Sequence, residues 1–481
     1  MNIVTFENVS KTYREGEHDR KILDSINLEI HAGEFILLVG KLGAGKTTLT
    51  NLIMGTEKPD SGTVLLFGSP IQSPGKRRLG YMHQKLRSPE RLKIEEFIEL
   101  YRSYYDQPFS LEELLDRSQL QTKRGDWADS KELSGGQERK LHYALAIAGN
   151  PEFLILDEPT PALDTDFKAA LLCQLKEFVS QKKTILLITQ EQAVVEELSP
   201  LATRILQLKD GKLQALKETQ ALKEADLTKL PSISLATQLK HTTDAFIGQT
   251  KVELLQMLRQ PGLLLSILFL YCTVALIPKG ENAFSSMIGI AGGGLLVTVT
   301  QTFGVQIATE RKQGWLRLLR ATPLPPWIYI ASKIAVATFI STLGLLIAFG
   351  LGIFKLGIEQ PVLNWLALSF CLLVGVLPFA LLGFAIAHLF EAGIISLISM
   401  GIFALAFFSS GCLPLPEMPL WLQDLIPFSP FYHYAQLVIW ASAPEEQYNQ
   451  LLGLHLEWLI WTACATGSLA SWAYKRDRAF G

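Results

Sequence analysis

A glycine-rich stretch near residue 40 carries the residue types that bind the phosphate groups of a nucleotide. In FILLVGKLGAGKTTL, an apolar run over residues 35–39 leads directly into glycines, a lysine and two threonines. Glycines let backbone N–H groups wrap around a phosphate, Lys46 reaches the outer phosphate oxygens, and the hydroxyl of Thr47 can ligate Mg²⁺. We therefore predict a P-loop that binds a nucleoside triphosphate with Mg²⁺. Its predicted binding residues are Gly40, Gly43, Gly45, Lys46, Thr47 and Thr48.

Two adjacent acids close a second apolar run, FLILDEPT, at residues 153–160. Ending a buried strand in two carboxylates is costly unless a positive group lies opposite them. With Mg²⁺ at the P-loop, Asp157 can hold the metal through water, and Glu158 can orient or deprotonate the water that attacks the terminal phosphate. An acidic strand end is common in isolation, so the assignment depends on the P-loop beside it.

A third stretch, ELSGGQERKLHYALAIAGNP, lies between these two. Ser134 followed three residues later by Gln137 is a capping-box pattern, and the apolar residues after it fall on one helical face until Asn150 and Pro151 end the helix. Gly135 and Gly136 then belong to a helix N-terminus that can meet an anion.

The elements that must position these residues are short buried strands. The two apolar runs above, and TILLIT at residues 184–189, are continuous rather than alternating, which is typical of parallel strands buried on both faces. Gln190 ends the third run and is expected to face a functional crevice. RILQLKDGKLQAL predicts two more strands around a turn at Asp210 and Gly211.

The order of these motifs resembles the nucleotide-binding domain of ATP-binding cassette (ABC) transporters over about residues 1–217. The resemblance implies an α/β P-loop domain with a helical subdomain, and it implies ATP and Mg²⁺ as cofactors. Tyr13 in SKTYREG matches the aromatic that stacks on adenine, and Gln84 in YMHQ matches the glutamine that contacts Mg²⁺. Residues 134–137 match the signature that touches the γ-phosphate of ATP bound by another subunit, and Asp164 matches the D-loop aspartate at the dimer seam.

Gln190 departs from this family's pattern, which has a histidine there that bonds the γ-phosphate. A glutamine amide can donate one hydrogen bond but cannot become cationic, so it stabilises transition-state charge less well. Because Glu158 is intact, slow ATP hydrolysis is the favoured interpretation, and a nucleotide-gated switch with little turnover is the alternative. Lys41 and Leu42 also depart from the pattern, which has a small residue or proline and then asparagine.

The second half of the chain has the composition of a membrane domain. The sequence is 48% hydrophobic with a net charge of −2, and no Lys or Arg lies between Lys355 and Lys475. Six apolar spans can be drawn at about 262–279, 283–308, 328–354, 362–389, 393–413 and 451–474. Basic residues lie in the second connection and after the last span, which places both termini in the cytosol. The net charge argues against a nucleic-acid partner.

Residues 218–240 form a charged linker, and residues 241–261 are amphipathic and can lie in the interface as an elbow helix. Residues 310–333 join a basic amphipathic turn to a Pro-rich segment that returns to the bilayer, and this stretch resembles the coupling region of type-2 ABC exporter permeases. The resemblance to these permeases extends over nearly all of residues 240–478. Candidate substrate contacts are polar or aromatic residues on helical faces, although packing between helices is favoured over substrate contact as their role. They are Thr298, Gln301, Thr302, Phe403 and Phe407.

Together these features predict an ABC half-transporter, with an α/β nucleotide-binding domain followed by an all-α, six-helix transmembrane domain at residues 241–478. The resemblance implies that two chains form a dimer, a homodimer in preference to a heterodimer, in the inner or plasma membrane. An apolar or amphipathic substrate would move outward from the cytosol or inner leaflet, because no strongly charged residue lies deep in the bilayer. The rival from another class is an ATP-gated membrane machine that transports nothing.

Overall fold

The computed structural model describes residues 2–15, 18–71, 73–83, 91–128, 132–218, 235–280, 283–409, 419–442 and 446–480. Contacts divide the chain into two compact units. Unit 1 comprises Met1–Val252 and Gln313–Ile330, and unit 2 comprises Glu253–Lys312 and Ala331–Gly481. Each unit is described by itself.

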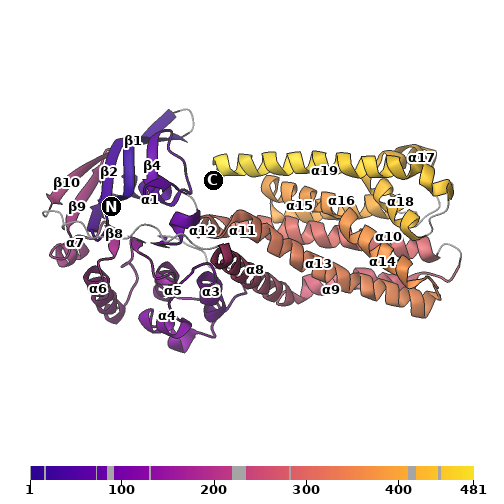
Figure 1. Cartoon of the computed structure of the whole chain (residues 1–481), viewed down its shortest axis with the longest axis horizontal. Coiled ribbons are helices and arrows are strands. Elements are labelled where there is room, and N and C mark those ends of the chain that lie inside the picture. The colour runs from indigo at the N-terminus through magenta and orange to yellow at the C-terminus, as the bar shows by residue number, and fades with distance from the viewer. Residues whose placement is uncertain are drawn as a thin grey trace. The chain divides into compact units, whose positions relative to one another are not determined.

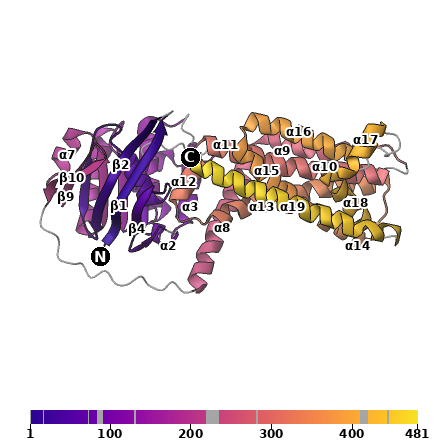
Figure 2. The same cartoon turned by 90° about the horizontal axis from the view of Figure 1, so that it is seen from above.

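Unit 1 contains two β-sheets (Figure 1). The first is antiparallel, with strand order β2-β1-β4-β5, and its longest strands β1 and β2 pair along their length (Figure 2). The second has strand order β10-β9-β3-β8-β7-β6 and is parallel except for β10. The strands are β1 (Asn2–Glu15), β2 (His18–His31), β3 (Phe35–Val39), β4 (Ser61–Leu66), β5 (Ser69–Pro70), β6 (Leu79–Met82), β7 (Phe153–Asp157), β8 (Thr184–Thr189), β9 (Arg204–Lys209) and β10 (Lys212–Glu218).

The strands expected from the apolar runs are confirmed. β7 and β8 are buried at every residue and β3 at all but its last, as a parallel strand covered on both faces must be. Helix α1 (Lys46–Met54) contributes Leu49, Leu52 and Ile53 to a core that it shares with both sheets. The turn between β9 and β10 also lies where it was predicted, at Asp210 and Gly211.

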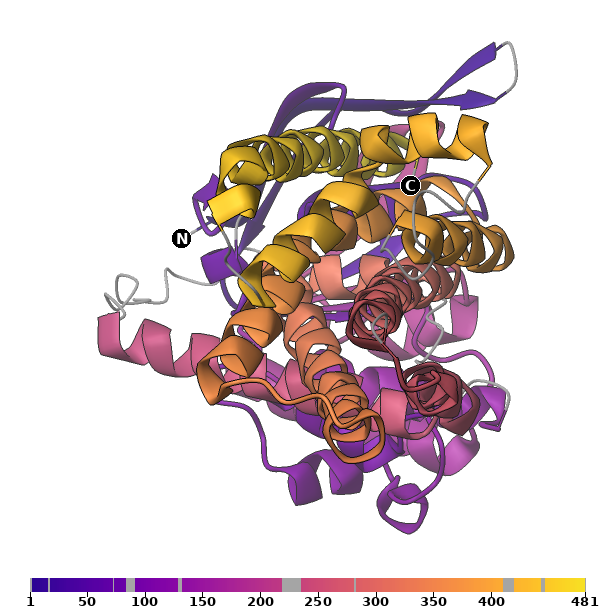
Figure 3. The ribbon, with the colours of Figure 1, turned by 90° about the vertical axis from the view of Figure 1, so that its right-hand side faces the viewer.

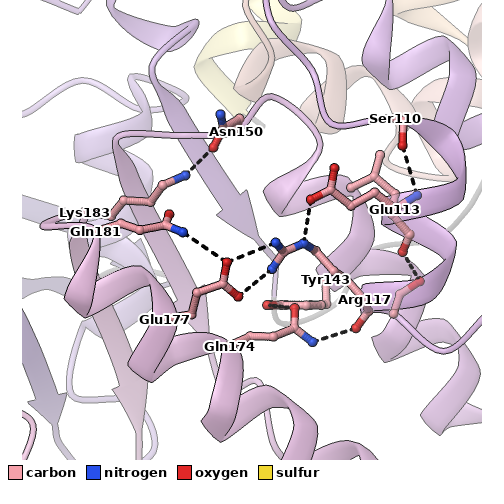
Figure 4. Close-up of polar contacts among 11 residues, drawn as sticks. Ser110, Glu113, Arg117, Tyr143, Asn150, Gln174, Glu177, Gln181 and Lys183 are labelled. Carbon is pink, nitrogen blue, oxygen red and sulfur yellow. Dashed lines mark hydrogen bonds and ion pairs between the residues drawn. The ribbon is translucent and has the colours of Figure 1, made fainter.

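Three helices of unit 1, α3, α4 and α5, pack together as a helical subdomain (Figure 1). Arg117 at the end of α4 makes paired hydrogen bonds to Glu177 of α6 at 3.0 and 3.1 Å and also bonds Glu113 at 3.1 Å (Figure 4). Besides α1, the helices before β10 are α2 (Ser73–Lys76), α3 (Ile94–Arg102), α4 (Leu111–Arg117), α5 (Gly135–Ile147), α6 (Thr165–Ser180) and α7 (Gln192–Leu198), with a 3₁₀ turn at Gln121–Lys123.

Two segments from the second half of the sequence also pack in unit 1. Helix α8 (Leu235–Leu258) contacts the end of α3, where the buried Tyr104 hydroxyl donates to Gln249 Oε1 at 2.7 Å. Helix α12 (Trp315–Ala321) places the Trp315 ring 5.5 Å from the Phe97 ring of α3. Lys76 Nζ donates to the carbonyl oxygen of Arg320 at 2.6 Å. Both segments therefore contact the same helical subdomain.

The described part of unit 2 is helical, and Figure 3 views several of its helices close to end-on. Helix α19 packs against α15 and α18, and α10 packs against α15 and α16. The helices are α9 (Pro261–Cys272), α10 (Ala283–Thr300), α11 (Gln306–Lys312), α13 (Pro326–Leu351), α14 (Val362–Gly375), α15 (Leu377–Leu389), α16 (Ala392–Ser409), α17 (Leu420–Leu425), α18 (Pro430–Ser442) and α19 (Glu446–Phe480), with single turns at Thr273–Leu276, Gln301–Val305, Gly352–Leu356 and Ile426–Phe428.

Within the described residues, three helical segments are long and apolar enough to cross a membrane: Ala283–Lys312, Pro326–Leu356 and Val362–Leu389. They coincide with the second, third and fourth predicted spans. The first, fifth and sixth predicted spans overlap α9, α16 and α19, so the number six stays a prediction. Large apolar side chains face outward in unit 2, among them Phe354 at 91% exposed, Leu363 at 75% and Trp461 at 74%. Such a surface is the one expected of lipid-facing helices.

Candidate ATP-binding site

A pocket of about 260 Å³ lies in unit 1 beside the start of α1. Eight of the predicted site residues border it, although they are spread over more than a hundred positions in the sequence. Its lining comprises Tyr13, Arg20 and Ile22 from the first sheet, residues 42–48 of the glycine-rich loop and α1, and Asp157 and Glu158 at the end of β7. The volume and the lining suit a phosphate chain with a base at one end.

The loop between β3 and α1 takes a conformation that needs glycine. Gly45 has φ of +102°, and a Cβ there would lie 2.9 Å from Ile22 Cγ2. Lys46, which is 7% exposed, donates from Nζ to the carbonyl oxygens of Gly40 at 2.7 Å and Lys41 at 3.1 Å. The ammonium group is therefore held inside the loop, where it faces the pocket and the helix N-terminus adds positive potential.

The two acids opposite the loop are almost fully buried, at 1% exposed for Asp157 and 2% for Glu158. Lys46 Nζ lies 3.9 Å from Glu158 Oε1. Burial raises the pKa of Asp157 to about 6 and also raises the pKa of Glu158, while Lys46 opposes both shifts. Asp157 Oδ2 and Glu158 Oε2 are buried and have no hydrogen-bond partner among the described residues. Two buried carboxylate oxygens beside a threonine hydroxyl suit Mg²⁺, which prefers oxygen ligands.

Gln190 follows β8 and reaches Glu158 through its backbone. Its N–H donates to the Glu158 carboxylate, and this bond lowers the pKa of Glu158 against the effect of burial. The side chain of Gln190 is exposed. The neighbouring Glu191 accepts a hydrogen bond from Thr160 Oγ1 at 3.2 Å, so the loops after β7 and β8 are joined.

The signature stretch lies outside the pocket lining. Ser134 caps α5 by accepting from Gln137 N at 3.3 Å, and Gln137 Oε1 accepts from Ser134 N at 2.9 Å, which confirms the capping box. Ser134 and Gly135 are exposed. A Cβ on Gly136 would lie 2.8 Å from the carbonyl oxygen of Ala162, so the signature helix and the D-loop approach closely.

Asp164 caps α6 by accepting from Phe167 N at 2.7 Å, and it pairs with Lys140 of α5 at 2.7 Å. Its ion pair with Lys140 lowers the pKa of the Asp164 carboxyl. The D-loop and the signature helix are thus in contact with each other, and neither lines the pocket of the same chain. Gln84 lies outside the described residues.

Sequence reasoning missed several residues at this site. Arg20 and Leu42 line the pocket, and Leu42 is 83% exposed. Arg139, five residues after Ser134, stabilises the charged forms of Asp157 and Glu158 electrostatically, while burial lowers the pKa of its own guanidinium. An arginine inside a predicted amphipathic helix gives no signal of this role, because only the packing of α5 against β6 and β7 brings it near the acids.

Of the candidate substrate contacts, Thr298 is fully buried in α10, and its hydroxyl donates to the carbonyl oxygen of Gly294 at 2.7 Å. This bond within the helix agrees with the packing interpretation. The backbones of Gln301, Thr302, Phe403 and Phe407 are helical, but their side chains lie outside the described residues.

Similarity to known proteins covers both units. A family model described as ABC transporter matches residues 23–161, and one described as ABC-2 family transporter protein matches residues 206–472, more than half of the chain. The uncharacterized ABC transporter ATP-binding protein YknY of Bacillus subtilis (strain 168) is 31% identical over 224 residues, which are 44% of this chain and 95% of that relative. The Nod factor export ATP-binding protein I of Burkholderia thailandensis is 30% identical over 234 residues, which are 47% of this chain and 73% of the relative.

The macrolide export ATP-binding/permease protein MacB 2 of Yersinia pestis bv. Antiqua is 30% identical over 245 residues, which are 48% of this chain but only 35% of that relative. A solved dimeric ATP-binding cassette in a post-hydrolysis state with ADP and Pi is 27% identical and covers 45% of this chain and 100% of its own, with a TM-score of 0.41. The matched family models place an ATPase domain and a membrane domain in one polypeptide. The chain therefore belongs to the ABC-2 family of transporter proteins, and it joins an ATPase domain coupled to transport with a membrane domain in one polypeptide.

Proposed function

We propose that the chain hydrolyses ATP with Mg²⁺ in the pocket beside α1. Lys46 and the backbone N–H groups of the loop hold the phosphates, and Thr47 and Asp157 hold the metal, with Gln84 as the third predicted contact. Tyr13 stacks on the adenine. Glu158 orients or deprotonates the attacking water, because its raised pKa and its unpartnered buried oxygen suit a general base.

The chain acts as a dimer. Each pocket holds a nucleotide on one side only, since residues 134–137 and Asp164 do not line the pocket of their own chain. A second chain that presents its signature stretch over the pocket would complete the γ-phosphate contacts and exclude water from the site. We favour a homodimer, because one chain carries both halves of such a site.

ATP hydrolysis is coupled to the membrane domain through the helical subdomain. The observation that carries this proposal is the packing of α12 and α8 on α3: Trp315 lies against Phe97, and Tyr104 donates to Gln249. Gly248 approaches so closely that a Cβ there would lie 2.6 Å from Ser103 Oγ. Helix α3 follows the segment that contains Gln84, so a change at the γ-phosphate can shift α12 directly.

The substrate is apolar or amphipathic and moves outward from the cytosol or the inner leaflet. The outward-facing apolar side chains of unit 2 and the gap in basic residues between Lys355 and Lys475 support six spans in an inner or plasma membrane. Both termini then lie in the cytoplasm. Export as the direction of transport is supported by two relatives, which are named for the export of macrolides and of Nod factors.

Steady-state phosphate release by the purified chain in lipid vesicles tests this proposal. Glu158→Gln should keep ATP bound but abolish turnover, because an amide cannot accept the proton of water. The wild type should release phosphate faster when a transported lipid or amphiphilic drug is added. If the wild-type rate equals that of Glu158→Gln under every condition, the proposed hydrolysis of ATP by Glu158 in this pocket is wrong.

A further inference from the structure

We propose that Glu57 is a positioning residue that fixes the ring of Tyr13 for the nucleotide base. This inference rests on the proposed function, in which Tyr13 stacks on the adenine. Glu57 does not line the pocket, and no motif includes it. It lies in the loop after α1, 44 residues from its partner in the sequence.

Both oxygens of the Glu57 carboxylate accept hydrogen bonds. The Tyr13 hydroxyl donates to Oε2, and Asn51 Nδ2 donates to Oε1 at 2.8 Å. Asn51 also holds the loop by its backbone, because its carbonyl oxygen accepts from Thr56 N at 3.1 Å and from Glu57 N at 3.3 Å. The carboxylate is therefore fixed from the α1 side before it meets the tyrosine.

Through α1, this arrangement connects the residues proposed to hold the phosphates with the ring proposed to stack on the base. The first turn of α1 carries Lys46 and Thr47, which face the phosphates, and Asn51 lies on the next turn of the same helix. Thr48, which also lines the pocket, hydrogen-bonds the Tyr13 hydroxyl as well. A tyrosine ring whose hydroxyl is held at two points keeps its orientation, so less conformational entropy is lost when a base stacks on it.

Attachment of the same loop to β1 is provided separately by Asp60. Its carboxylate accepts from Thr12 N at 2.7 Å and from Lys11 Nζ at 3.2 Å. The Asp60 carboxylate therefore holds the Thr12 backbone and the Lys11 ammonium group next to Tyr13, whereas the Glu57 carboxylate holds the Tyr13 hydroxyl itself. This difference supplies a matched control: Asp60→Asn loosens the loop without removing the acceptor of Tyr13.

The test measures the affinity of the full chain in lipid vesicles for ATP, and also for inorganic tripolyphosphate, which has no base, by displacement of a fluorescent ATP analogue. Glu57→Ala and Tyr13→Phe should each weaken ATP binding by about 2- to 10-fold. The double variant should bind no more weakly than Tyr13→Phe, because Tyr13→Phe has already removed the hydrogen bond that Glu57→Ala removes. Glu57→Gln should restore most of the affinity, since its amide oxygen still accepts. Tripolyphosphate binding should stay unchanged in all of them, and kcat should change less than KM.

Three results would overturn the inference: unchanged ATP affinity in Glu57→Ala, an equal loss in Asp60→Asn, or a parallel loss of tripolyphosphate affinity, which would show damage to α1 instead. Tyr13→Ala separates this inference from the proposed function. If Tyr13→Ala leaves ATP affinity unchanged, the stacking role of Tyr13 fails. If Tyr13→Ala weakens binding and Glu57→Ala does not, only the role of Glu57 fails.

Discussion

At the scale of single residues, Gln190 contacts the predicted catalytic acid by its backbone rather than by its side chain. The N–H of Gln190 donates to Glu158, and any residue other than proline can supply that bond. Replacing the amide side chain by an imidazole therefore leaves Glu158 positioned as it is. The exposed side chain at this position is free to meet the terminal phosphate of a bound nucleotide.

Gln190→His should raise the steady-state rate of phosphate release. A protonated imidazole can stabilise the charge that develops on the phosphate, and one such contact corresponds to about 10- to 100-fold in rate. Gln192→His, which places an imidazole two residues further along at an exposed position of α7, is the control and should leave the rate unchanged. An unaltered rate in Gln190→His would show that this side chain does not limit turnover.

His142 of α5 gives unit 1 a pH-dependent stability. Burial lowers its pKa to about 3, and neither ring nitrogen has a hydrogen-bond partner among the described residues. Between pH 6.5 and 3 the unfolded state binds the proton and the folded state does not, so stability is present above pH 6.5 and falls as the pH is lowered through this window.

Hydrogen exchange of the α5 amides, corrected for intrinsic rates, should show the opening free energy falling between pH 7 and pH 5, with His142 contributing about 2 kcal/mol of the loss. His142→Leu should remove that contribution. His31→Leu, at a partly exposed histidine of β2, should retain it. Equal pH dependence in wild type and His142→Leu would contradict the assignment. Burial also lowers the pKa of His83 to about 4, so some dependence remains in both proteins.

At the scale of elements, a buried ion cluster in unit 2 joins α11 and α13 to the last residues of α8, which belong to unit 2 from Glu253 on. Lys333 of α13 is 1% exposed, and its Nζ donates to Glu253 of α8 and Glu310 of α11, each at 2.8 Å. Gln306 Nε2 donates to the same oxygen of Glu253 at 2.9 Å. These charges are removed from water, so removing the lysine would leave two buried carboxylates without a compensating charge.

Lys333→Met should destabilise the chain by about 3–5 kcal/mol, because it removes the ammonium group from two buried carboxylates. The measurement is the thermal unfolding midpoint of the purified chain in detergent, together with hydrogen exchange of α8, α11 and α13. Lys355→Met provides the control, since Lys355 is exposed in the turn that follows α13, and its midpoint should match the wild type. A Lys333→Met midpoint equal to that of the control would mean that the cluster does not hold these helices.

At the scale of the whole molecule, the separation of the pocket from the signature stretch decides how many chains form one site. If the site is composite, a chain with Lys46→Ala and a chain with Ser134→Arg should each be inactive alone, since each damages both sites of its homodimer. Mixed dimers keep one intact P-loop opposite one intact signature. Co-expression should therefore restore part of the phosphate release, whereas a site completed within one chain would show no restoration.

The fold of unit 1 could be predicted in detail because its signals are local. Continuous apolar runs predicted β3, β7 and β8, and Ser134 with Gln137 predicted the start of α5. The spans of unit 2 were harder, since length and apolarity establish only three segments within the described residues. Helices such as α9, with 12 residues, are apolar but too short to count by themselves.

By itself the sequence determined which residues can bind phosphate and metal and at which strand ends they lie, because both depend on residue type and on near neighbours. Only the tertiary structure decided which distant side chains meet. Glu57 finds Tyr13, Arg139 comes near Asp157, and Lys333 joins two acids that are 57 residues apart in the sequence. These pairings have no periodicity or fixed spacing, since they follow from how sheets and helices pack, and packing brings together residues that share no local pattern.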